Sequence, residues 1–145
     1  AVFLFTGVLI VCGSYYALTG ELTVTVIAWS VPPGLFAALL LLGNELRDYE
    51  EDLRDGHGTF SVRFGARRAA ALYRALAATI AGGTVLLAFV LGTPLAAAAA
   101  PALVLLPLRH LEASVQERRG LARVTGRTYA LYSSVLIIGI WMSSS

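Results

Sequence analysis

The feature that most constrains this chain is a run of apolar residues from Leu22 to Gly43 that contains no charged side chain. As an α-helix rising about 1.5 Å per residue, this run would reach roughly 33 Å, and the hydrocarbon core of a bilayer is about 30 Å thick. A second, nearly uncharged run extends from Ala1 to Leu18. Apolar runs of this length predict helices that cross a membrane.

Three further apolar segments follow along the chain: Ala69 to Leu91, Leu95 to Leu108 and Thr128 to Met142. We therefore expect five spans in an all-α, multi-span transmembrane helix bundle that forms a single domain over residues 1–145 and has the lipid bilayer as its main partner. The composition agrees, because 57% of the residues are hydrophobic and only 14% are charged, whereas soluble domains average about 25% charged.

The basic residues predict how the bundle is oriented. All eleven are arginine, and nearly all fall in two charged loops, at about 44–68 and 109–127, while the connections at 19–21 and 92–93 contain none. The positive-inside rule places both arginine-rich loops in the cytoplasm, so we expect a multi-pass protein of the inner cell membrane. A chain this apolar has little soluble surface for a phosphate backbone, and we expect no nucleic-acid partner.

One polar row stands out where the second apolar run meets the first charged loop. Asn44, Asp48 and Asp52 are spaced four apart, so on a continuing helix they lie on one face and their oxygens can converge. Mg²⁺ takes oxygen ligands and is commonly held by one or two carboxylates together with substrate phosphates. If the oxygens converge, a hard divalent cation such as Mg²⁺ is the natural candidate to bind this row.

A plainer interpretation of the same residues is a solvated helix end. Arg47 and Arg54 can each pair with Glu51 at helical spacing, and runs of charge are usually water-facing. That interpretation leaves Asp48 and Asp52 with no basic residue four positions further on. The spacing alone leaves both interpretations open.

The residues after this row can bring the chain back over the helix end. Gly56 to Thr59 has the composition of a turn, and Arg63 after it can bind an anionic group. His57 is able to carry a proton near neutral pH, or it is a solvated residue of the turn. Cys12, the single cysteine, excludes an intramolecular disulfide.

The segment from Asn44 to Gly65 resembles the second aspartate-rich motif of the UbiA superfamily of intramembrane aromatic prenyltransferases. The resemblance is closest to the 1,4-dihydroxy-2-naphthoate polyprenyltransferases of menaquinone biosynthesis. Their pattern reads Asn-x-x-Arg-Asp-x-x-x-Asp, then Gly-Lys-x-Thr, then Val-Arg-x-Gly. The residues that fit are Asn44, Arg47, Asp48, Asp52, Gly56, Thr59, Val62, Arg63 and Gly65. Two positions depart from it, since His57 replaces the usual lysine and Gly58 a frequent arginine.

The resemblance implies an enzyme that transfers a polyprenyl group from an allylic diphosphate to an aromatic acceptor. It implies that Asp48 and Asp52 are catalytic and hold Mg²⁺ with Asn44, while Asn44, Arg47, Arg63 and His57 contact the diphosphate. The alternative for Arg47 is an ion pair with Glu51.

Members of that superfamily have nine membrane helices and a first aspartate-rich motif in their N-terminal half. The five expected spans resemble the last five helices, and no segment of this sequence matches the first motif. We therefore expect the N-terminal half, with that motif, as a further partner of this chain. The alternatives are a non-catalytic membrane fragment or subunit, another UbiA-type prenyltransferase with a different acceptor than 1,4-dihydroxy-2-naphthoate and, more remotely, half of a transporter.

Overall fold

The computed structural model describes residues 3–106, 108 and 120–144. Every regular element in these residues is helical, which confirms the all-α prediction. In chain order the elements are η1 (Phe3–Leu9, a π-helical stretch), α1 (Ile10–Thr19), α2 (Val24–Arg47), α3 (Tyr49–Asp55), α4 (Phe60–Phe64), α5 (Ala66–Val90), η2 (Pro94–Leu105, a 3₁₀-helix) and α7 (Leu121–Ser144).

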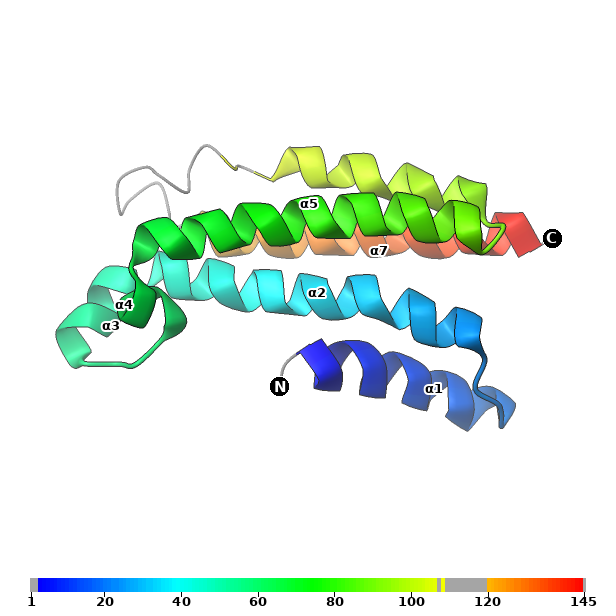
Figure 1. Cartoon of the computed structure of the whole chain (residues 1–145), viewed down its shortest axis with the longest axis horizontal. Helices are drawn as coiled ribbons and strands as arrows, with labels where there is room; N and C mark the ends of the chain where they lie inside the picture. Colours follow the sequence, from blue (N-terminus) through cyan, green and yellow to red (C-terminus); the bar gives the residue numbers. More distant parts are fainter. Residues whose placement is uncertain (1–2, 107, 109–119, 145) are drawn as a thin grey trace.

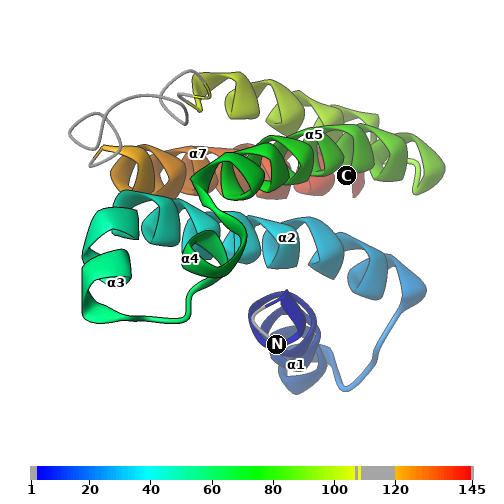
Figure 2. The ribbon, with the colours of Figure 1, turned by 60° about the vertical axis from the view of Figure 1, so that its left-hand side comes forward.

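The long elements lie lengthwise beside one another (Figure 1). Helices α2, α5 and α7 and the 3₁₀-helix η2 form the main bundle, and α1 packs along the outside of α2 (Figure 2). The short helices α3 and α4 stand together at the end of the bundle where α2 ends and α5 begins. The candidate site lies at the end of the bundle that carries these two short helices.

Local chemistry sets the limits of α1 and α2. Gly20 ends α1 in the left-handed region at φ 73°, and its N–H donates to the carbonyl of Tyr16 at 2.8 Å, a helix end that glycine favours. The Thr23 hydroxyl then caps α2 by accepting from the N–H of Val26 at 3.2 Å. From that cap α2 runs unbroken across Pro32 and Pro33 to Arg47.

The core lies between α2, α5, η2 and α7. Its fully buried side chains include Phe36, Leu39, Leu46, Tyr73, Ile80, Ala96, Ala99 and Tyr132. Small residues bring two pairs of elements into backbone contact: a Cβ on Gly139 of α7 would lie 2.7 Å from the Cα of Ala96 in η2, and one on Gly7 of η1 would lie 2.5 Å from the Cα of Gly34 in α2. Such close approaches are typical of helices packed in a membrane.

Two helices among the described residues are long and apolar enough to cross a membrane, α2 with mean hydropathy 1.9 and α5 with 1.6. Only 33% and 28% of the residues in their most apolar stretches are buried, whereas the core helix of a soluble protein is mostly buried. Large apolar side chains such as Phe89, Ile137 and Trp141 face outward at 65–69% exposure. An apolar exterior of this extent is what lipid contact requires.

The structure changes several predicted boundaries. The segment expected as a loop at about 44–68 is largely helical, because α2 continues to Arg47 and α3 and α4 follow. The last apolar segment begins earlier than Thr128, since α7 starts at Leu121 and includes Arg123 and Arg127. The segment from Leu95 falls mostly in η2, and residues 109–119 of the second charged loop lie outside the described residues.

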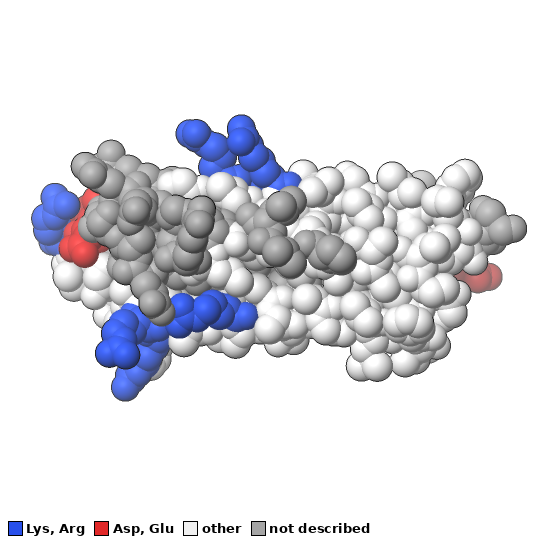
Figure 3. All heavy atoms as spheres, turned by 90° about the horizontal axis from the view of Figure 1, so that it is seen from above, with Lys and Arg blue, Asp and Glu red and all other residues white. Residues whose placement is uncertain are grey.

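The charged side chains are distributed unevenly along the bundle. Figure 3 shows the arginine and acidic side chains gathered over the half that carries α3 and α4, whereas the other half shows almost none. The described arginines of α5 and α7 that contribute, Arg67, Arg68, Arg123 and Arg127, all lie near the first residues of their helices. One end of the bundle is therefore suited to water and anionic groups, and the rest to an apolar medium.

Candidate functional site

The predicted row of Asn44, Asp48 and Asp52 does not lie on one straight helix. Asp48 joins α2 to α3 with φ −92° and ψ 4°, which departs from helical geometry in ψ. The Asp48 N–H donates to the Asn44 carbonyl at 3.0 Å, and the Asp48 carbonyl accepts from the Asp52 N–H at 2.9 Å. The chain therefore changes direction at Asp48, where α2 ends and α3 begins.

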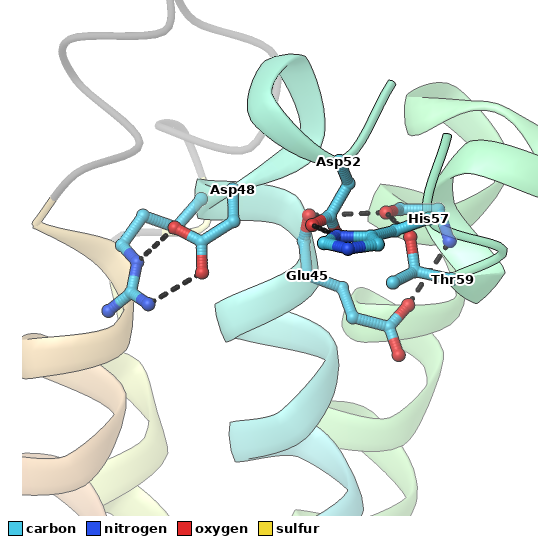
Figure 4. A network of polar contacts seen from close by, with 7 residues as sticks. Glu45, Asp48, Asp52, His57 and Thr59 are labelled. Carbon is cyan, nitrogen blue, oxygen red and sulfur yellow. Dashed lines mark hydrogen bonds and ion pairs between the residues drawn. The ribbon is translucent and has the colours of Figure 1, made fainter. Parts of the chain in front are cut away.

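This change of direction separates the two carboxylates. In Figure 4 the Asp48 side chain points toward one side of the α2 end and the Asp52 side chain toward the other, where the turn to α4 lies. In this structure their oxygens therefore do not converge on one point. Within the described part of the chain, no three acidic, histidine or cysteine residues are grouped so that they could hold a metal ion.

Arg47 binds the Asp48 carboxylate with two hydrogen bonds, from Nε to Oδ1 at 2.7 Å and from Nη2 to Oδ2 at 2.6 Å. The ion pair of Arg47 is therefore with Asp48, and Glu51, the alternative partner, acts on Arg47 only through its charge. Adjacent residues diverge on a regular helix, and the turn at Asp48 is what lets the two side chains meet. These hydrogen bonds lower the pKa of Asp48 below its usual value, although burial acts in the opposite direction.

Asp52 contacts a histidine instead of an arginine. The Asp52 Oδ1 lies 3.2 Å from Nδ1 of His57, and the His57 backbone N–H donates to the Asp52 carbonyl at 2.9 Å. Gly56, at φ 73°, ends α3 and turns the chain so that His57 can fold back. The Asp52 side chain is 15% exposed and that of His57 64% exposed, so the histidine covers the acid from the solvent side.

A third polar contact was not predicted. The carboxylate of Glu45 accepts a hydrogen bond from the backbone N–H of Ser61 at 3.1 Å, and the Ser61 hydroxyl donates to the Glu45 carbonyl at 3.1 Å. Ser61 is fully buried, and its Oγ also lies 3.3 Å from that of Thr59. This contact joins the end of α2 to α4 across the turn. No sequence signal pointed to it, because the two residues meet only after the chain has reversed.

The other predicted site residues lie at the same end of the bundle. Asn44 is half-buried one helical turn before Asp48. Arg63 is exposed in the last turn of α4. The structure thus gathers all six predicted residues of the site at one end, with Arg47 beside Asp48 and His57 beside Asp52.

Below this end, α5 and α7 are joined by buried hydroxyl pairs. Tyr73 Oη lies 2.6 Å from Thr125 Oγ1, and Tyr132 Oη lies 2.5 Å from Thr84 Oγ1. The ring of Phe36 packs between those of Tyr129 and Tyr132, with centroid distances of 5.0 and 5.3 Å. These contacts fix three long helices together beneath the charged end.

The chain was compared with known proteins. A model of the UbiA prenyltransferase family matches residues 1–135. A 1,4-dihydroxy-2-naphthoate octaprenyltransferase of Haemophilus influenzae is 39% identical over 66 residues, which cover 46% of this chain and 21% of that relative. No solved structure matches the chain.

The family match extends over nearly the whole chain, from the apolar helices on one side of the charged end to those on the other. It agrees with the resemblance found at Asn44 to Gly65. The family is membrane-integral, in keeping with the apolar exterior of α2 and α5. The chain belongs to the UbiA prenyltransferase family.

Proposed function

We propose that this chain supplies one diphosphate-binding end of a membrane enzyme that transfers a polyprenyl group from an allylic diphosphate to an aromatic acceptor. The observation that carries the proposal is the pair Asp48 and Asp52, presented at a charged end of an apolar bundle, with Arg47 beside Asp48 and His57 beside Asp52. We propose 1,4-dihydroxy-2-naphthoate as the acceptor, supported by the name of the Haemophilus influenzae relative.

The donor chemistry of this end suits Mg²⁺. Two carboxylates and an amide oxygen, from Asp48, Asp52 and Asn44, are hard oxygen ligands, and Mg²⁺ needs only one or two carboxylates when substrate phosphates complete its shell. We propose these three residues as its ligands in the substrate-bound enzyme, which requires Asp48 and Asp52 to turn toward each other from the orientations seen in Figure 4. Mg²⁺ bound there would neutralise the charge that develops on the departing diphosphate.

Arg47 and His57, which contact the two aspartates, have a second role in this proposal. Arg47 binds the Asp48 carboxylate through bidentate hydrogen bonds, the same geometry with which a guanidinium binds a phosphate. Once the substrate is bound, Arg47 and His57 turn from the carboxylates to the diphosphate oxygens. Arg63, exposed on α4, adds a third positive group. Charge on the leaving group is thereby compensated by residues that already stand at this end.

The apolar bundle has its own part in the reaction. The prenyl tail lies among the long helices, whose aliphatic and aromatic side chains keep water from the allylic cation that forms as the diphosphate departs. The ring carbon of the acceptor then attacks this cation. For the whole bundle we propose five spans in this chain, both arginine-rich segments in the cytoplasm, and a first aspartate-rich motif supplied by the N-terminal half of the enzyme.

The experiment that tests this function is prenyl transfer in membranes that hold the whole enzyme, measured with Asp48→Asn and Asp52→Asn. Asp55→Asn is the matched control, because Asp55 is an exposed acid at the end of α3. We expect transfer to fall at least about a hundredfold in the first two variants, the scale on which a lost catalytic electrostatic contact acts, and to stay near wild type in the control. Equal activity in all three would overturn the proposal and favour a non-catalytic membrane subunit.

A further inference from the structure

A pair of hydrogen bonds joins the end of α2 to α4, on either side of the segment that carries Asp48 and Asp52. We name residues 46–60, which include α3 and the turn to α4, the head segment. Its two flanking residues, Glu45 and Ser61, are joined by two hydrogen bonds of 3.1 Å, one from the Ser61 N–H to the Glu45 carboxylate and one from the Ser61 hydroxyl to the Glu45 carbonyl. Ser61 is fully buried and Glu45 is partly exposed, so the contact is shielded from water on its Ser61 side.

The direction of the Glu45 side chain distinguishes it from the aspartates. In Figure 4 its carboxylate points toward the turn that carries Thr59, whereas the Asp48 carboxylate points to the opposite side. One of its oxygens, Oε2, accepts from a backbone N–H. Glu45 is therefore used to hold two parts of the chain together, although it lies directly beside Asn44 in the acidic motif.

We propose that Glu45 is a positioning residue, which with Ser61 closes the head segment and so fixes Asp48 and Asp52 at the end of α2. This inference rests on the proposed prenyl transfer. The physical reason is that closing a loop of this length costs conformational entropy, and a site that binds a diphosphate gains when its oxygen ligands are held near their working positions. The contact between Asp52 and His57 then folds the closed segment onto itself.

The chemistry of glutamine separates this role from metal binding. The Glu45→Gln variant would keep a side-chain oxygen that accepts from the Ser61 N–H, so the contact between residues 45 and 61 is weakened and not lost. Alanine removes this acceptor and leaves only the hydrogen bond from the Ser61 hydroxyl to the backbone carbonyl of residue 45. A hydrogen bond to a charged group is stronger than a neutral one by a factor of about five in an equilibrium constant. A metal ligand would instead need the negative charge, and glutamine would then be nearly as harmful as alanine.

The test compares Glu45→Ala, Glu45→Gln and Ser61→Ala in the whole enzyme in lipid nanodiscs, with Glu50→Gln as the control on α3. Hydrogen–deuterium exchange of the head segment is measured beside steady-state prenyl transfer. We expect exchange to rise about tenfold or more in Glu45→Ala and about fivefold in Glu45→Gln, with α5 and α7 unchanged. We also expect KM for the prenyl diphosphate and the Mg²⁺ concentration for half-maximal rate to rise in the same order. Ser61→Ala, which keeps its backbone N–H, is the milder variant should Glu45→Ala fail to fold.

Each result decides between the two roles. Exchange in Glu45→Ala equal to that in Glu50→Gln overturns the closure of the head segment, and faster exchange with unchanged KM and Mg²⁺ dependence overturns the positioning role. Equal loss of transfer in the glutamine and alanine variants without faster exchange would make Glu45 a ligand. Absence of transfer in the wild-type enzyme counts against the proposed function alone, because exchange still decides whether Glu45 closes the segment.

Discussion

The buried pair of Thr84 on α5 and Tyr132 on α7 allows a stability prediction with a definite order. The Thr84 hydroxyl donates to the Ile80 carbonyl at 2.7 Å, which uses its one proton. Tyr132 must therefore be the donor in the 2.5 Å contact between the two hydroxyls. Both side chains are fully buried. The two partners are thus unequal: when the pair is broken, Tyr132 loses the acceptor for its proton, whereas Thr84 loses only a donor.

This inequality sets the magnitudes. Tyr132→Phe keeps the ring that packs 5.3 Å from Phe36 and removes one hydrogen bond, which costs about 0.5–1.5 kcal/mol of unfolding free energy. Thr84→Val keeps the shape of the side chain but leaves the Tyr132 hydroxyl without this acceptor in an apolar interior, which costs about 1–3 kcal/mol. The double variant removes both groups, and we expect it to be more stable than Thr84→Val alone.

The free energy of unfolding in mixed micelles measures this order, followed by the fluorescence of Trp29 and Trp141. Thr79→Val is the control, because Thr79 is exposed on the same helix, and it should change stability little. The assignment of donor and acceptor is refuted if Tyr132→Phe destabilises the protein as much as Thr84→Val, or if the two effects add in the double variant.

Two further predictions concern packing and pH. Gly7→Ala should destabilise the protein by about 1–3 kcal/mol, because the added Cβ would lie 2.5 Å from the Cα of Gly34. Gly13→Ala is the control, since a Cβ there meets nothing within 4 Å and should not destabilise the protein. Equal unfolding midpoints for the two variants would contradict this prediction. Arg47 lowers the pKa of Asp48 in the folded state. The ion pair therefore stabilises the fold at pH values above 3.8, the ordinary pKa of an aspartate, and this stabilisation is lost as the pH falls through the lowered pKa. An Asp48→Asn variant should lack that acid-dependent loss, and an identical acid titration of unfolding would contradict it.

The apolar runs predicted the long helices because a bilayer requires length and hydrophobicity, both of which can be read directly. The limits of those helices were predicted less well. Helix α2 continues beyond Gly43 through Asn44 to Arg47, and α5 begins at Ala66, before the expected Ala69. Charged residues such as Arg47 and Arg67 are good helix formers, so a change from apolar to polar residues marks the membrane surface without ending a helix.

The candidate site shows where sequence spacing stops being informative. The interval of four between Asp48 and Asp52 predicts one face only if the helix is regular, and ψ of 4° at Asp48 breaks that condition. The pairing of Arg47 with Asp48 follows from the same local change. The contact of Glu45 with Ser61 depends on the path of the whole head segment, which no local pattern specifies.

The most direct test of the proposed prenyl transfer is the mass of the product formed in membranes that hold the enzyme. Polyprenyl diphosphate and 1,4-dihydroxy-2-naphthoate are supplied with Mg²⁺, and in a parallel sample with a chelator in excess. We predict a prenylated naphthoate with Mg²⁺, which disappears with the chelator and returns when Mg²⁺ is added back. Prenylated product at the same rate in the chelated sample, or none in either sample, would contradict the proposal.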